Sequence, residues 1–339
     1  MKGLQVVHDD LDGRPAAALM RDGVLDDFLL SAPDDAPPVP GSIFRAITDR
    51  PLKGQGGMMM KLPGGDMALF RGAKGLKPGE PLLVQVTSYA EAGKAVPVTD
   101  RIIFKGRYVI VTPGAAGINV SRQIRDEEEK VRLLEILHQF EMPEGIGLIV
   151  RSSAEGAAED DIAAEAEHFL GLAVAVLNDA DTQPELLVDG GDAQEVAERE
   201  WPVAETVDGF EAHGVLDALA LLDTAEVTLG GTTLFIEPTR ALVAVDVNTG
   251  GDFSPASGLK ANLACARALP RELRLRGLGG QITLDLAPMA KKDRKQFEQA
   301  LRSAFKADPV ETALVGWTPL GHYELQRKRE RLPLPKGIA

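Results

Sequence analysis

Three polar side chains, Asp246, Asn248 and Asp285, end two apolar segments in a pattern that suits metal-dependent phosphate chemistry. Side chains alternate between the two faces of a strand, so in residues 242–248 Asp246 and Asn248 share one face and the valines share the other. Residues 282–286 repeat the pattern, with Asp285 opposite the apolar side chains. A single aspartate after a strand is more often a helix cap or a turn residue. It is the recurrence of the arrangement that indicates a site.

The two segments have the ingredients of a βαβ unit, because a loop and one predicted helix, residues 259–276, lie between them. Strands joined in this way run parallel, and their carboxyl ends meet at one edge of the sheet. At the spacing of adjacent strands, about 4.8 Å, the carboxylates of Asp246 and Asp285 would share one small volume. Two such carboxylates repel unless a cation lies between them, and Mg²⁺ suits one or two carboxylates plus waters. On geometry alone, a metal site and two unrelated turn aspartates are equally good interpretations of this pattern.

The rest of the sequence predicts the elements that position these groups. Short alternating runs broken by Gly and Pro in residues 41–104 predict a small barrel such as an OB-fold. A tight Pro-Thr-Arg turn joins residues 232–238 to 242–248, which predicts an antiparallel pair. The other predicted elements are strands within 1–30, 107–114 and 145–153, and helices over 126–140, 160–177 and 291–306.

The length and composition indicate a globular protein. The chain has 339 residues, enough for about two domains, and is 44% apolar and 26% charged. No apolar run approaches the ~18 residues of a membrane span, and the first residues lack an apolar signal stretch. We therefore expect a cytoplasmic protein without membrane contact. The single cysteine, Cys265, excludes an intrachain disulfide framework and a cysteine-rich zinc site. Its position within the predicted helix 259–276 predicts a small core residue.

The net charge of −14 is unevenly distributed along the chain. From Glu155 to Glu226 there are 20 acidic residues and one basic residue, Arg199, which gives a local charge of −19. From Leu259 to the end there are 16 basic and 8 acidic residues, a local charge of +8. The acidic total therefore does not exclude a polyanionic partner for the basic C-terminal quarter.

Several motifs resemble the ribonuclease E/G family of bacterial endoribonucleases. They are, in order, ALVAVDVNTGG, ANLACARALPRELRLRGLGGQITLDLAPM and LGHYELQRKRERLPL. The family pattern is an Asp-X-Asn strand, an Asn-Leu helix ending in Arg-Leu-Arg-X-Leu-Gly-Gly, a second Asp-bearing strand, and an Arg-rich Leu-Gly-X-X-Glu element. The run GLIVRSS and the barrel segment 41–105 also resemble parts of the family.

The resemblance implies a mixed α+β and α/β chain of several subdomains. An RNase H-like part is expected in residues 1–40 and, after an interruption, in 183–225, where it is trimmed relative to large family members. The interruption comprises an OB-fold RNA-binding barrel, 41–105, and a 5′-sensor-like subdomain, 106–182. A DNase I-like α/β catalytic part, 226–339, follows.

Matched position by position, the resemblance implies that Asp246 and Asp285 hold Mg²⁺ and that Asn248 hydrogen-bonds near the scissile phosphate. The expected reaction is attack of a metal-activated water on a phosphodiester of single-stranded RNA, leaving 5′-phosphate and 3′-hydroxyl ends. No covalent nucleophile is needed for this chemistry.

Three further residues match RNA-binding positions of the family. Arg151 and Ser152 match a pair that binds the 5′-monophosphate of RNA, and Lys94 matches a barrel residue that faces substrate. A guanidinium offers a bidentate fork to a terminal phosphate, and a hydroxyl adds a third hydrogen bond. Without the resemblance, Arg151 would be expected to pair with a nearby acid such as Glu155, and Lys94 to be a solvated surface lysine.

The chain departs from the family pattern in three respects. The barrel stretches that carry base-stacking aromatic rings in the family read Met58-Met59-Met60 and Met67-Ala68-Leu69, with Phe70 one step out of phase. A ring stacked on a base is worth about 1–3 kcal/mol, so positioning of the substrate would be weaker. Pro270 is expected to kink or split the helix before the glycine pair. No Cys-X-X-Cys motif occurs, so no zinc-linked dimer is expected.

The leading interpretation is thus a Mg²⁺-dependent endoribonuclease of RNA processing or decay. The alternative is an RNA-binding protein of the same fold with weak or no cleavage activity. A metal phosphodiesterase that acts on DNA or nucleotides is a third interpretation.

Overall fold

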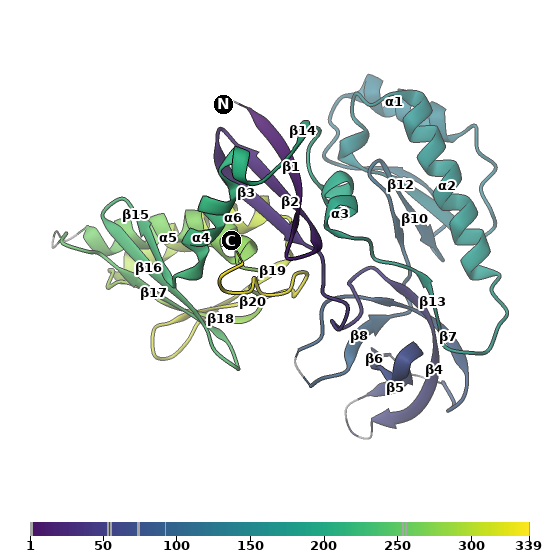
Figure 1. Cartoon of the computed structure of the whole chain (residues 1–339), viewed down its shortest axis with the longest axis horizontal. Helices are drawn as coiled ribbons and strands as arrows, with labels where there is room; N and C mark the ends of the chain where they lie inside the picture. The colour runs from purple at the N-terminus through teal and green to yellow at the C-terminus, as the bar shows by residue number, and fades with distance from the viewer. Residues whose placement is uncertain are drawn as a thin grey trace. The chain divides into compact units, whose positions relative to one another are not determined.

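The computed structural model describes residues 3–52, 54, 56–72, 75–91, 93–252, 254 and 256–338. Two compact units divide the chain (Figure 1). Unit 1 comprises Met1–Asp34 and Ala204–Ala339, and unit 2 comprises Asp35–Val203. None of the helices that the structure describes is long and apolar enough to cross a membrane.

Unit 2 contains a small closed barrel, as predicted. Its strands are β4 (Ile43–Leu52), β5 (Gly57–Lys61), β6 (Met67–Arg71), β7 (Pro81–Val86) and β8 (Val96–Thr99). The order is β4-β5-β6-β8-β7, and β4 also pairs with β7, which closes the sheet on itself. Met58, Met60 and Phe70 fill the interior together with Val84. A sixth strand, β13 (Glu185–Val188), pairs antiparallel with the first residues of β4.

A four-stranded sheet with two helices forms the rest of the core of unit 2. The sheet has the order β11 (Gly117–Val120), β12 (Ile146–Val150), β10 (Val109–Pro113) and β9 (Phe104–Lys105). Helix α1 (Glu127–Leu137) begins where the Asp126 side chain accepts hydrogen bonds from two backbone N–H groups. Helix α2 (Glu159–Leu177) buries Ile162, Ala166 and Leu170, which recur at helical spacing. The short helix α3 (Ala193–Glu200) begins with a capping box between Asp192 and Glu195.

The first sheet of unit 1 combines segments from both ends of the sequence. Its order is β14 (Glu205–Asp208), β1 (Leu4–Leu11), β2 (Arg14–Arg21) and β3 (Val24–Leu30), with β14 parallel to β1. The short helix α4 (Val215–Ala220) contributes Val215 and Leu219 to its core. The alanines of β2 are fully buried, so this strand is covered on both of its faces.

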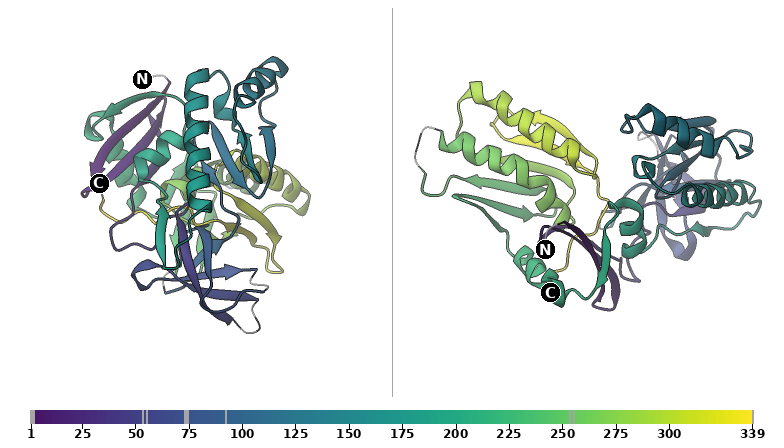
Figure 2. Two further views of the ribbon diagram at one scale, coloured as in Figure 1. Left: turned by 90° about the vertical axis from the view of Figure 1, so that its right-hand side faces the viewer. Right: turned by 90° about the horizontal axis from the view of Figure 1, so that it is seen from above.

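The second sheet of unit 1 has six strands. In order they are β15 (Glu226–Leu229), β16 (Thr232–Pro238), β17 (Val243–Asn248), β18 (Gly280–Asp285), β20 (Tyr323–Arg327) and β19 (Thr312–Trp317). Helices α5 (Ser257–Leu275) and α6 (Arg294–Ala307) lie side by side over the sheet (Figure 2). The buried residues of β17 and β18 pack with Ala261, Cys265 and Leu269 of α5, so the polar residues of both strands face away from these helices.

Two expectations about α5 have clear outcomes. The helix runs without interruption through Pro270, so the expected split of the helix is wrong. Leu269 and Leu273 on either side of this proline are fully buried, and this packing outweighs the lost backbone hydrogen bond. Cys265 is a buried core residue, as its mid-helix position predicted. The subdomain boundaries expected from the resemblance stay a prediction.

Candidate functional site

Asp246 and Asp285 lie directly opposite each other on neighbouring parallel strands. They are the last register partners of the β17–β18 pair, which runs from Val243 with Ile282 to Asp246 with Asp285. This pairing confirms the parallel arrangement expected from the βαβ pattern. Partners in register project to the same face, and both side chains are exposed, Asp285 to 71%. Two separated carboxylates are thus brought together at one edge of the sheet.

The burial pattern explains why the carboxylates point outward. Along β17 the valines are buried beneath α5, while Asp246 and Asn248 are exposed. In β18 the buried residues are Ile282 and Leu284, which leaves Asp285 on the exposed face. A shift of either strand by one residue would move its carboxylate into the core, so hydrophobic packing fixes the position of the site.

Asn262 of α5 holds the chain just after Asp285. Its buried side-chain amide donates a hydrogen bond to the carbonyl oxygen of Ala287 (2.8 Å) and accepts one from the Ala287 N–H (3.0 Å). At Gly258, one turn earlier, a Cβ atom would lie 1.8 Å from the carbonyl oxygen of Pro288, so only glycine allows this close approach. Sequence analysis did not assign a role to Asn262. The signal was a polar residue on the apolar face of a predicted helix.

Two more polar residues contact the aspartates. The Asn248 side-chain amide donates a hydrogen bond to Asp246 Oδ2 (2.8 Å). His322 Nε2 lies 3.7 Å from Asp285 Oδ1. His322 is held in the turn between β19 and β20 by two hydrogen bonds with Thr318. The histidines of the chain show no ligand spacing in the sequence, and it is the fold that brings His322 to Asp285.

The donor set fits a hard divalent cation that retains waters. Carboxylate oxygens from two register partners face solvent on one side of the sheet, and an amide orients one of them. Within the described ranges no group of three or more His, Cys, Asp or Glu residues has the geometry of a metal cluster. A pair of exposed carboxylates with room for waters is a donor set that a hard divalent cation accepts.

Arg151 and Ser152 lie in unit 2, where β12 leads into a short 3₁₀ turn (Ser152–Ala154). The Arg151 guanidinium is engaged inside the protein. Its Nη2 donates to Glu200 Oε2 (2.8 Å), and its Nη1 donates to the carbonyl oxygens of Gly106 and Arg199. An acidic partner was one expectation for Arg151, but the partner is Glu200 of α3 and not the nearby Glu155.

Glu200 itself has three cationic partners. Lys105 Nζ lies 2.8 Å and Arg199 Nε 3.0 Å from Glu200 Oε1, opposite the contact with Arg151. Burial of the Glu200 carboxyl acts to raise its pKa, but the charges of Lys105, Arg151 and Arg199 outweigh burial and hold the pKa below its ordinary value. Glu200 is therefore a carboxylate at neutral pH, held within a cluster of excess positive charge.

On the barrel, Lys94 lies in the segment between β7 and β8. Its Nζ is 2.7 Å from Glu91 Oε2, and its side chain is exposed. Met59 and Leu69 are register partners on β5 and β6 and are half-buried on the outer face, whereas Phe70 is buried in the barrel interior. The positions that the resemblance matches to aromatic rings thus carry flexible or aliphatic side chains here.

The fold and the paired aspartates define a mixed α+β protein with a small closed barrel and a two-carboxylate edge site. The family model "Ribonuclease E/G family" matches residues 103–208 and 194–330, and the chain belongs to this family. Ribonuclease G of Salmonella typhimurium is 31% identical over 301 aligned positions, covering 76% of this chain and 61% of the relative. Ribonuclease E of Nostoc is 29% identical over 301 positions, covering 75% of this chain and 44% of the relative. Ribonuclease G of Escherichia coli K12 is 29% identical over 302 positions, covering 76% of this chain and 61% of the relative. The chain thus spans about three fifths of the Ribonuclease G relatives.

Proposed function

We propose that this chain is an endoribonuclease that cleaves single-stranded RNA at a Mg²⁺ centre on Asp246 and Asp285. The observation that carries the proposal is the register pairing of these two exposed carboxylates at the end of two parallel strands. Membership of the Ribonuclease E/G family and relatives named Ribonuclease G and Ribonuclease E support RNA as the substrate. We expect the protein to act in the cytoplasm, in RNA processing or decay.

In this proposal Asp246 and Asp285 hold the cation, and Asn248 positions both Asp246 and the reacting groups. When bound, the cation lowers the pKa of a coordinated water and offsets charge that develops on the phosphate. Asn248 already donates one N–H to Asp246, and its amide oxygen is an acceptor that can orient the attacking water. Hydrolysis then leaves a 5′-phosphate and a 3′-hydroxyl.

Lys94, Arg151 and Ser152 are the proposed RNA-binding residues outside the metal centre. Lys94 would contact the backbone from the barrel, where its exposed ammonium can exchange Glu91 for a phosphate. Arg151 and Ser152 would bind a terminal phosphate, with the guanidinium and the hydroxyl as donors.

We also propose the subdomain assignment expected from the resemblance. It comprises an RNase H-like part in 1–40 and 183–225, an OB-fold RNA-binding barrel in 41–105, a 5′-sensor-like subdomain in 106–182 and a DNase I-like catalytic part in 226–339. The closed barrel and the α5-covered sheet support the second and the last of these assignments.

A second candidate function is RNA binding with weak or no cleavage. The outer barrel face favours it, because Met59 and Leu69 offer no ring for a base to stack on. Tight, salt-sensitive RNA association without turnover would identify this function.

The test is cleavage of single-stranded oligoribonucleotides with 5′-monophosphate or 5′-hydroxyl ends, with Mg²⁺ or with a chelator. Asp246→Asn and Asp285→Asn should each abolish cleavage, and Asp217→Asn on the exposed side of α4 should leave it unchanged. Cutting that survives both substitutions, or that persists in the chelator, would refute the proposed centre. The downstream product should be a substrate for ligation without prior phosphorylation, because the cleavage leaves a 5′-phosphate on it.

A further inference from the structure

Three cationic side chains converge on the carboxylate of Glu200. Arg151 bonds one oxygen, and Lys105 and Arg199 contact the other, at distances of 2.8–3.0 Å. The carboxylate thus occupies a cluster that carries three positive charges against its single negative one. Such convergence of two guanidinium groups and an ammonium is an arrangement that binds a phosphate monoester.

We propose that Glu200 is a built-in occupant of this anion site and a specificity-determining residue that competes with the 5′-monophosphate of RNA for Arg151. The inference rests on the proposed function of Arg151 as a phosphate-binding residue. It adds that the native chain discriminates little between phosphorylated and hydroxyl ends, because the fork is already filled.

The donors of Arg151 leave little room for a second anion. Nη1 is committed to two backbone carbonyl oxygens, those of Gly106 and Arg199, which also fix the plane of the guanidinium. Nη2 is the donor that reaches Glu200. A phosphate that binds this face of Arg151 must therefore displace the Glu200 carboxylate or share a donor with it.

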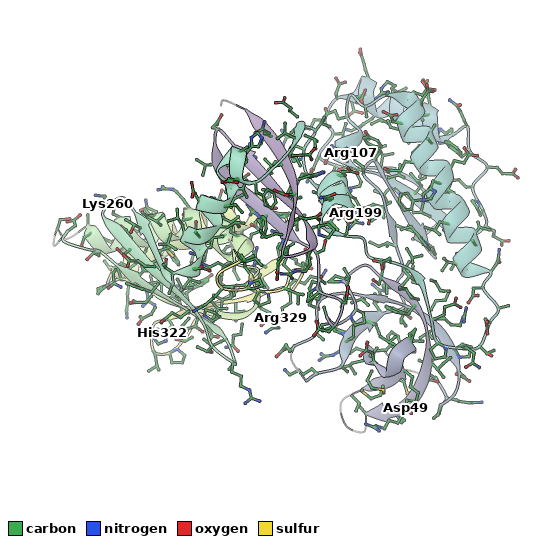
Figure 3. The ribbon with its side chains drawn as sticks, in the orientation of Figure 1. Asp49, Arg107, Arg199, Lys260, His322 and Arg329 are labelled. Carbon is green, nitrogen blue, oxygen red and sulfur yellow. The ribbon has the colours of Figure 1, made fainter. Side chains whose placement is uncertain are left out.

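Glu200 is placed so that it can be displaced. It is the last residue of α3, and its side chain retains 26% exposure, so the cluster reaches solvent. Its backbone anchor does not depend on the carboxylate, because the following Trp201 is buried and its N–H bonds to the carbonyl oxygen of Ala197. Movement of one side chain would leave Lys105, Arg151 and Arg199 facing one open position. Figure 3 shows Arg199 on α3.

Glu200→Gln is the discriminating variant, because glutamine keeps the shape and one acceptor but removes the charge. Its matched control is Glu198→Gln, an exposed glutamate of the same helix. The first readout is affinity for a fluorescent oligoribonucleotide with a 5′-monophosphate or a 5′-hydroxyl, measured by anisotropy in a chelator at constant ionic strength. Because no cleavage is required, this readout does not depend on the metal centre.

In this assay wild type and Glu198→Gln should bind the two ends within about twofold of each other, since Glu200 fills the fork. Glu200→Gln should prefer the 5′-monophosphate by about tenfold, the scale of one hydrogen-bonded charge pair. The double variant Glu200→Gln with Arg151→Ala should again bind the 5′-monophosphate no more than about twofold more tightly than the 5′-hydroxyl, because the hydrogen-bonded charge pair is lost. A strong 5′-phosphate preference in wild type, or no gain in Glu200→Gln, would overturn the proposal.

The second readout uses inorganic phosphate as the probe. A ligand that binds only the folded state raises the melting temperature of the protein, by an amount that grows with the ratio of ligand concentration to dissociation constant. Phosphate also stabilises folded proteins in general, because it is excluded from their surface. Relative to chloride at equal ionic strength, it should therefore raise the melting temperature of Glu200→Gln by more than it raises those of wild type and Glu198→Gln. If Glu200→Gln does not fold, the wild-type comparison of the two RNA ends still decides, because a strong end preference in wild type contradicts a filled site and equal affinity for both ends supports one.

Cleavage assays separate this inference from the proposed function. A protein that binds ends as predicted but never cuts RNA would contradict the endoribonuclease proposal and leave the role of Glu200 intact. A protein that cuts RNA with an end preference unaffected by Glu200→Gln would contradict the inference and leave the nuclease intact.

Discussion

Asn262 and Ala287 exchange two hydrogen bonds between a side-chain amide and one backbone unit, at 2.8 and 3.0 Å. The Asn262 side chain is fully buried, and Ala287 follows Asp285 by two positions. The pair therefore ties α5 to the segment that leaves the sheet edge carrying Asp246 and Asp285. The buried amide supplies the hydrogen-bond donor and acceptor that a neighbouring strand would otherwise supply to the backbone of Ala287.

Replacing this amide should destabilise the protein and disturb the site. Asn262→Ala leaves the N–H and the carbonyl oxygen of Ala287 buried without partners, at an expected cost of about 2–4 kcal/mol in the free energy of unfolding. Urea unfolding measures this cost, and cleavage below the unfolding transition should also fall. Gln296→Ala, an exposed amide on α6, is the control and should leave both quantities nearly unchanged. A cost no larger than that of the control would show that the pair does not support the sheet edge.

A buried ion-pair network should be the most sensitive electrostatic feature of unit 1. Asp308 accepts from Arg327 at 2.9 Å and also pairs with Arg274, and the side chains of Asp308 and Arg327 are each 1% exposed. Removing one partner leaves the other charges unpaired in the interior. Asp308→Ala should therefore lower the free energy of unfolding by about 3–5 kcal/mol. Chemical denaturation measures the loss.

The comparison for this prediction is the exposed pair of Glu127 and Lys130 on α1. Glu127→Ala should change the free energy of unfolding by less than about 1 kcal/mol, because solvent screens such a pair. Equal losses for the two variants would mean that burial does not amplify the Asp308 contacts.

A pH-dependent contribution to stability is expected from Glu129. Its carboxylate accepts from Arg132 and from the backbone N–H of Gly156, and these hydrogen bonds lower its pKa from 4.5 to about 2. A carboxyl group with a lowered folded-state pKa stabilises the protein above its unfolded-state pKa, and this stabilisation is lost as pH falls through the folded value. Thermal unfolding of wild type and Glu129→Gln should therefore differ at pH 7, and the difference should shrink between about pH 4.5 and pH 2.

Glu128→Gln serves as the control for that series, because it removes a first-turn charge of α1 without touching the Arg132 fork. It should lower the melting temperature at pH 7 by less than Glu129→Gln does. A wild-type and Glu129→Gln difference that grew on acidification would reverse the sign and disprove the assignment.

Much of this architecture was predictable from residue patterns. The alternation of valines with Asp246 and Asn248 predicted both the strand and its exposed face, and the intervening loop and helix predicted the parallel pairing with β18. The barrel was predictable from the spacing of its short strands. These features follow from periodicity, which is local information.

The contacts of Arg151 were not predictable in the same way. Twenty acidic residues lie between Glu155 and Glu226, and nothing in their order distinguishes Glu200 from the rest. Its selection depends on where α3 ends relative to β12, which is a tertiary relationship. Likewise Pro270 lies within an uninterrupted helix because the surrounding leucines are buried, and local propensity carries no information about that burial.

The parallel pairing of β14 with β1 has a consequence for how the protein is made. Asp9 accepts a hydrogen bond from the backbone N–H of Phe210, a partner 201 positions later in the chain. The pairing of β1 with β14 must therefore wait during synthesis until the residues between them have left the ribosome. Closing so long a loop costs entropy that grows only with the logarithm of its length, and a module that has already folded shortens the effective loop further. Early folding of the residues between β1 and β14 would thus lower the entropic cost of pairing these two strands.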